Sequence, residues 1–177
     1  MSATESIARS NLIAALVQSD ELRRSERADR ILWLSKYQIP LGIVVGQMDA
    51  MAVIGEARDC FIEGHYIASL LMCVAFIEHT ITDTLVEHDL AKYGINLSEA
   101  IKVAGNAGLF PLDMLSRADR LRDIRNPFTH RKNPNHRHTF GNRFHEERVH
   151  PQIILERDAK EALELMYAYY HSSLNVG

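Results

Sequence analysis

The sequence has few cysteines and no long apolar run, and these two absences narrow the possible classes of protein. Only two of the 177 residues are cysteines, Cys60 and Cys73, and both stand among apolar residues. Two such thiols fit reduced core residues better than a disulfide or a metal site. The longest uncharged apolar candidate, 66–77, covers roughly 12 residues, whereas a membrane helix needs about 20. We therefore expect no transmembrane segment.

The N-terminus lacks the features of a secretory signal. It begins with Ser2, Thr4 and Glu5 and has neither a basic start nor an apolar stretch, so we expect cytoplasmic residence. No internal repeat or low-complexity tract is present. The length suits one domain with a filled core, and 46% hydrophobic with 24% charged residues is typical of a globular protein.

The chain also lacks a strong excess of either charge, because its formal net charge is only −3. The charges are nevertheless unevenly distributed. Residues 117–150 contain nine arginines and lysines against four acids, a net of +5, so the remainder carries −8. A local positive field on an acidic body favours binding of a polyanion at one place. A solvated loop with scattered arginines is the alternative interpretation of the same segment.

Apolar residues recur at three- and four-residue steps, and no stretch alternates with the period of an exposed strand, so the fold class predicted is all-α. We expect a compact helical bundle with two additional N-terminal helices and a long polar loop before the last helix. The whole chain, 1–177, would be a single domain with an N-terminal helical extension at 1–40 and a core at 47–173. The predicted helices are 5–18, 20–37, 47–63, 65–92, a short one from 98, one from Pro111 to 124, and 153–172, with a loop at 132–151.

One short segment, Leu121-Arg122-Asp123-Ile124-Arg125-Asn126-Pro127-Phe128-Thr129-His130-Arg131, combines groups that RNA cleavage requires. An arginine can hold a phosphate, and a histidine can transfer a proton. Because Pro127 cannot donate a backbone hydrogen bond, we expect the helix to kink or restart at Asn126–Pro127. Residues five apart in a regular helix point about 140° apart, but such a break would let Arg125 and His130 converge.

Glu78 is a charged residue at an apolar position, because it falls on the apolar stripe of the long helix between Val74 and Ile81. A charge on a packing face is costly unless it is paired. We therefore expect Glu78 to face the Arg125–His130 turn, where it either pairs with Arg125 or fixes the tautomer of His130. Asn126 and His130 are four residues apart, so the amide could orient the imidazole or contact substrate.

The segment resembles the Arg-Asn-x-x-x-His signature of the HEPN superfamily, small helical proteins that are often metal-independent ribonucleases of toxin–antitoxin and phage-defence systems. The resemblance implies a homodimer whose motif helices form a composite cleft that cleaves RNA through its 2′-hydroxyl. It implies no cofactor and no metal. In it Arg125 would hold the scissile phosphate, His130 would act as acid or base, Asn126 would assist, and Glu78 would support them. The basic residues expected to bind RNA are Arg122, Arg131, Lys132, Arg137 and Arg143.

The fit to the family is incomplete at one position. In HEPN toxins paired with nucleotidyltransferase antitoxins a tyrosine commonly follows the histidine by two residues, and here that residue is Lys132. An antitoxin or nucleotidyltransferase partner remains an expectation, but control by tyrosine modification there is in doubt. The His136–His138 pair could bind zinc, although the loop offers no cysteine or regularly spaced acidic ligand. The alternatives to a nuclease are a non-catalytic HEPN module that binds RNA or a protein, and a helical scaffold in which the motif has only structural meaning.

Overall fold

A computed structural model describes residues 2–37 and 48–174 of the chain, and within them it contains seven helices and no strand. The predicted all-α class is therefore confirmed. The chain forms two compact units, Met1–Gln38 and Ile39–Gly177, each of which is described by itself. The predicted connector at 39–46, including the stop at Pro40, lies outside the described residues.

The first unit is a single helix, α1 (Ala3–Leu34). Its start is fixed by a capping box: the Ser2 hydroxyl accepts from the Glu5 amide at 3.3 Å, and the Ser2 amide donates to the Glu5 carboxylate at 2.6 Å. The prediction of two helices with a boundary near residue 19 is wrong. No glycine or proline occurs in this stretch, and Arg23 donates to the Ser19 hydroxyl at 2.9 Å, so nothing interrupts the helix.

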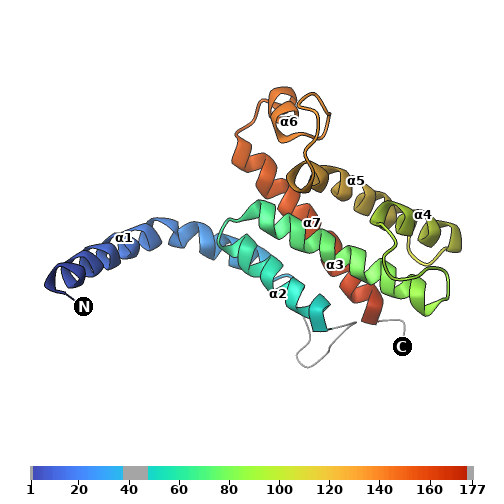
Figure 1. The fold of residues 1–177 in the computed structure, drawn as a ribbon, viewed down its shortest axis with the longest axis horizontal. Coiled ribbons are helices and arrows are strands. Elements are labelled where there is room, and N and C mark those ends of the chain that lie inside the picture. The colour runs from blue at the N-terminus through green and yellow to red at the C-terminus, as the bar shows by residue number, and fades with distance from the viewer. Residues whose placement is uncertain (1, 38–47, 175–177) are drawn as a thin grey trace. The chain divides into compact units, whose positions relative to one another are not determined.

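The second unit contains the other six helices, and α3 (Tyr66–Glu87) runs through its centre (Figure 1). It packs most extensively on α2 (Met48–Ile62) and α7 (Pro151–Leu174), and also against α4 (Leu97–Ala107) and α5 (Leu112–Thr129). Its buried side chains, including Leu70, Val74, Ile77 and Ile81, follow the spacing expected for a central helix. The apolar stripe seen in the sequence therefore positions Glu78 in the middle of the unit.

Helix α3 ends earlier than predicted, at Glu87 rather than near residue 92. Asp89 adopts a left-handed conformation with φ of 57°, and the His88 ring nitrogen lies 2.8 Å from the Thr84 carbonyl. The chain then turns through Gly94, whose φ of 93° favours glycine, and α4 begins after Asn96 rather than after Ser98. The loop between α3 and α4 is thereby folded back beside α3.

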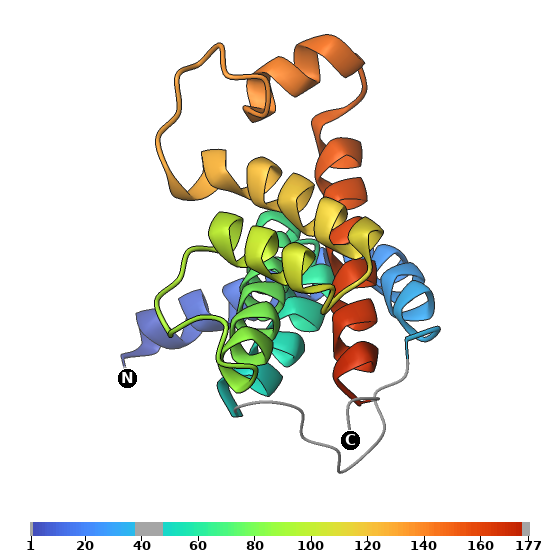
Figure 2. The ribbon, with the colours of Figure 1, turned by 90° about the vertical axis from the view of Figure 1, so that its right-hand side faces the viewer.

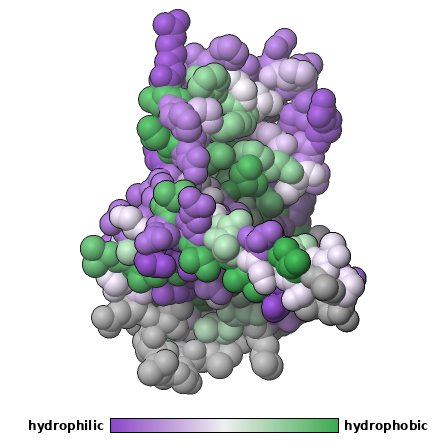
Figure 3. Space-filling view, turned by 90° about the vertical axis from the view of Figure 1, so that its left-hand side faces the viewer, coloured by the Kyte–Doolittle hydropathy of each residue, from purple (hydrophilic) through white to green (hydrophobic). Residues whose placement is uncertain are grey.

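The predicted long loop before the last helix contains a helix of its own, α6 (Phe140–Glu147), so this part of the prediction is wrong. Figures 1 and 2 place α6 at one end of the unit, beyond the end of α5 and the start of α7. That end, at the top of Figure 3, mixes hydrophilic and hydrophobic residues instead of presenting one continuous apolar surface. The segment between α5 and α7 is therefore an ordered cap on this end of the unit.

Among the described residues, α3 alone has the length and apolar composition of a membrane span, and 50% of its most apolar window is buried inside the protein. Core helices of globular proteins commonly have the same composition. Both cysteines are free: Cys73 is buried, and burial raises the pKa of its thiol, while Cys60 is partly exposed. A buried thiol with a raised pKa is a poor nucleophile and serves as packing.

Candidate functional site

The predicted contact between Glu78 and the motif helix is present. The Arg125 guanidinium donates through Nη2 to Glu78 Oε2 at 3.3 Å, and this ion pair joins α5 to the centre of α3. The two side chains are 18% and 33% exposed, so the pair lies at the edge of the core. Of the two roles considered for Glu78, pairing with Arg125 is therefore the one observed. Arg125 is positioned by a carboxylate while part of it still reaches solvent.

The end of α5 differs from the prediction, because the helix neither stops nor restarts at Pro127. It continues to Thr129, and His130 is the first extended residue, with φ of −132° and ψ of 130°. Pro127 lies so close to the helix end that its missing N–H removes only one late hydrogen bond. Phe128 packs against Phe140 of α6 with ring centroids 6.4 Å apart, which helps to hold this last turn.

Continuity of α5 has a consequence for Arg125 and His130. The break that was expected to bring these two side chains together is absent, because α5 is continuous through Pro127. His130 is exposed, and among the described residues its ring makes no hydrogen bond or ion pair. Asn126 is half-buried four residues before it. The imidazole is thus free to meet a ligand from solvent.

Three of the cations expected to bind RNA lie in the loop that follows His130. Arg131, Lys132 and Arg137 have no carboxylate partner within the described parts of the chain, and Arg137 donates to the His138 ring at 2.6 Å. Arg131 and Arg137 are exposed. We call residues 130–139 the basic loop. It offers unpaired positive charge directly next to the motif histidine.

Two other residues of the predicted RNA-binding set form ion pairs with carboxylates of the protein. The Arg122 guanidinium lies 2.8 Å from Asp119 and 2.9 Å from Asp123 on its own helix. Arg143 is buried, with its two terminal nitrogens 2.6 and 2.7 Å from the Asp158 carboxylate oxygens. A buried guanidinium paired in this way has a structural role, which argues against the predicted contact of Arg143 with RNA. The positive charge of Arg122 is neutralised by its two neighbouring carboxylates, so Arg122 attracts a phosphate only weakly.

Arg143 instead anchors α6 to α7. Asp158 lies in α7, 15 residues further along the chain, and is 1% exposed. Glu147 at the end of α6 pairs with Arg157 of α7 at 2.7 Å, and the hydrogen bond from Arg157 lowers the pKa of the Glu147 carboxyl. His138 lies 3.6 Å from Asp123 of α5. The basic loop is consequently held between fixed ends.

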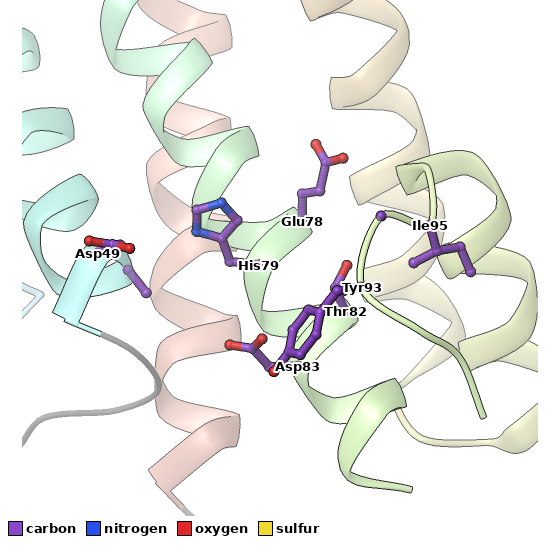
Figure 4. Close-up of a pocket in the computed structure, with 9 residues that line it drawn as sticks. Asp49, Glu78, His79, Thr82, Asp83, Tyr93 and Ile95 are labelled. Carbon is purple, nitrogen blue, oxygen red and sulfur yellow. The ribbon is translucent and has the colours of Figure 1, made fainter. Parts of the chain in front are cut away.

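A cavity of about 330 Å³ opens beside Glu78, and it was not predicted from the sequence. Its polar side chains come from the start of α2, from α3 and from the α3–α4 loop (Figure 4). They are Asp49, Glu78, His79, Thr82, Asp83 and Tyr93. Because these residues belong to three separate segments, only the folded chain brings them together. Glu78 therefore stands between this cavity and Arg125.

Within the described residues, no group of three histidine, cysteine, aspartate or glutamate side chains is arranged to hold a metal ion. No protein family, no curated protein and no solved structure matches the chain. The site's chemistry must therefore be judged from its own residues. It combines a positioned guanidinium, an exposed imidazole and a loop of unpaired cations.

If the site cleaves RNA, as its motif predicts, replacing Glu78 with alanine is expected to lower the cleavage rate by about 10- to 100-fold, because Arg125 loses the carboxylate that positions it. The measurement is the initial rate on a defined RNA, with circular dichroism to verify folding. Glu87, an exposed glutamate on the same helix, supplies the control Glu87→Ala, which should keep the wild-type rate. Full activity and full stability in Glu78→Ala would exclude a role for the pair.

Proposed function

We propose that the protein is a metal-independent endoribonuclease of the HEPN type that acts in the cytoplasm. The observation that carries the proposal is the Glu78–Arg125 ion pair, because it holds a motif arginine next to a helix end that exposes a histidine. The unpaired cations of the basic loop support it, since RNA backbone binding depends on such charges. Residues Arg125, Asn126 and His130 keep the roles that the HEPN signature implies.

The proposed reaction uses the nucleophile that RNA itself carries. The 2′-oxygen bonds to the adjacent phosphorus while the bond from phosphorus to the 5′-oxygen breaks, which leaves a 2′,3′-cyclic phosphate and a 5′-hydroxyl. A base must accept the 2′ proton, and an acid must supply a proton to the 5′-oxygen. His130 is the group assigned to one of these transfers. Arg125 is assigned to stabilise the charge that develops on the phosphoryl oxygens.

One protomer is not expected to provide the complete site. It has a single motif histidine, and α5 has no break that would turn this histidine toward Arg125. A two-fold dimer that places the α5 ends of both copies around one cleft would supply two imidazoles and two guanidinium groups. We therefore propose a homodimer as the active form, with the α5 ends at its interface.

The dimer proposal predicts that activity follows assembly. On dilution, the cleavage rate per protomer should fall in step with the dimer fraction measured by analytical ultracentrifugation. Protein kept above the dissociation constant is the control and should show a constant rate per protomer. A monomer with undiminished cleavage would contradict the composite site.

The second candidate is a non-catalytic module that binds RNA, and the unpaired cations of the basic loop favour it equally. Incubation of purified protein and its His130→Ala variant with total RNA, in the presence of a chelator, distinguishes the possibilities. Cutting that the variant loses supports the nuclease. Binding without cutting supports the module. If the protein neither binds nor cuts RNA, only a helical scaffold remains. A toxin or defence role, with an antitoxin or nucleotidyltransferase as partner, remains part of the proposal for the active enzyme.

A further inference from the structure

The cavity beside Glu78 carries negative charge that the protein does not neutralise. Asp49 and Asp83 both line it, and neither has an ion pair or a hydrogen bond to its side chain among the described residues. Asp83 is half-buried, and burial raises the pKa of its carboxyl, with the nearby His79 partly opposing this rise. Asp49 is exposed, whereas the Asp83 carboxylate is partly desolvated without a cationic partner, so a cationic ligand there would be stabilised.

An unpaired hydroxyl on a largely buried residue gives a second, independent indication of a ligand. Thr82 lines the same cavity and is only 9% exposed, yet its hydroxyl has no hydrogen-bond partner in the described chain. The neighbouring threonines behave differently: Thr80 donates to the Phe76 carbonyl at 3.0 Å, and Thr84 donates to the Thr80 carbonyl at 2.9 Å. The Thr82 hydroxyl is not among the buried unpaired atoms of the described residues and belongs to the cavity wall, so it is available to accept from a group in the cavity.

The distribution of the carboxylates indicates the shape of this ligand. In Figure 4, Asp49, His79 and Asp83 lie on the side of α2, whereas Glu78 extends toward α5. The carboxylates do not converge on one point, in agreement with the absence of a three-residue metal group in the described residues. A single compact cation can therefore satisfy only part of the cavity. A ligand with several separated ammonium groups could reach more than one carboxylate.

The rest of the lining suits the carbon chain of such a ligand. Ala50 and Ile95 provide apolar surface, and Tyr93 is 64% exposed at the rim, where its ring can stack on an alkyl chain or an ammonium group. A phosphate or a nucleotide is disfavoured, because the two unpaired carboxylates, Asp49 and Asp83, would repel its charge. We propose that this cavity is a binding site for an aliphatic di- or polyamine.

The test is isothermal titration calorimetry of the full chain with putrescine and spermidine, at a monovalent salt concentration that screens diffuse attraction. One site per chain is expected, with tighter binding of these amines than of butylamine, which carries only one ammonium group. Asp83→Asn should weaken spermidine binding by about 10- to 100-fold, because it removes a charged partner. This variant should fold well, since burial already disfavours the charged carboxyl.

Two further variants keep the test specific. Thr82→Val preserves the shape of the side chain and removes the hydroxyl, so binding should weaken by about 2- to 10-fold. Asp59→Asn removes one exposed carboxylate from α2 outside the cavity, and its affinity should stay within about twofold of wild type. Neither variant changes a residue assigned to RNA cleavage. Binding can therefore be judged separately from the proposed nuclease.

Three results would overturn the inference. The first is no saturable binding by wild-type protein, and the second is an equal loss of affinity in Asp59→Asn and Asp83→Asn, which would indicate diffuse attraction. The third is displacement of spermidine by equimolar Mg²⁺ or by a mononucleotide, which would assign the cavity to a metal ion or a nucleobase.

Discussion

Replacing His130 with alanine is expected to lower the rate of RNA cleavage by about 10²- to 10⁴-fold, the range that a general acid or base contributes. The side chain is exposed and makes no contact within the described residues that would stabilise the fold, so the free energy of unfolding should change by less than about 0.5 kcal/mol. The measurement is a single-turnover cleavage rate together with an equilibrium denaturation curve. Loss of rate without loss of stability would identify a chemical role.

The matched control for this experiment is His145→Ala. His145 is also exposed, and it lies in α6 outside the basic loop. Its variant should keep the wild-type rate and stability. If His130→Ala and His145→Ala cleaved RNA equally well, His130 would have no part in catalysis. If both lost activity, general loss of positive charge would explain the effect.

Replacing Asp158 with alanine is expected to cost about 3–5 kcal/mol of unfolding free energy, the largest effect predicted for any single change in stability. The reason is that Arg143 would remain buried without its partner, and the two side chains are only 9% and 2% exposed. For a chain of this size the midpoint of thermal unfolding should fall by about 6–20 °C. Differential scanning calorimetry measures this shift.

A double replacement separates the ion pair from simple packing. Arg143→Met combined with Asp158→Leu substitutes apolar side chains for both charges and should recover most of the lost stability. Arg157→Ala is the control on the neighbouring, more exposed pair with Glu147 and should cost no more than about 1 kcal/mol. A change below 1 kcal/mol in Asp158→Ala would show that α6 does not depend on the buried pair.

The sequence allowed the helical class and the central helix to be predicted because both depend on local periodicity. The apolar spacing of α3 predicted its packing face. Because an unpaired charge on that face is unfavourable, a partner for Glu78 was expected, and Arg125 was correctly predicted as that partner. The predicted boundary near residue 19 is wrong, because no glycine or proline interrupts the helix there. Polar residues alone do not end a helix.

The features that were missed depend on contacts between distant segments. Helix α6 has eight residues and little helical stability of its own, so it is held by Arg143 and Asp158, a pair that periodicity cannot reveal. The expected break at Pro127 failed for a related reason, because Phe128 packs on Phe140 of α6. The cavity beside Glu78 is lined by three separate segments, so it could not be predicted from local sequence patterns either. The motif residues could therefore be recognised in the sequence. The carboxylate partners that determine which cations remain unpaired could not.

The measurement that tests the proposed function most directly is the chemical identity of RNA ends produced by the wild-type protein in excess chelator. The expected products carry a 2′,3′-cyclic phosphate and a 5′-hydroxyl, and DNA of the same sequence should not be cleaved. Absence of cleavage by the dimeric protein, or cleavage that requires a divalent metal and leaves 5′-phosphates, would contradict it.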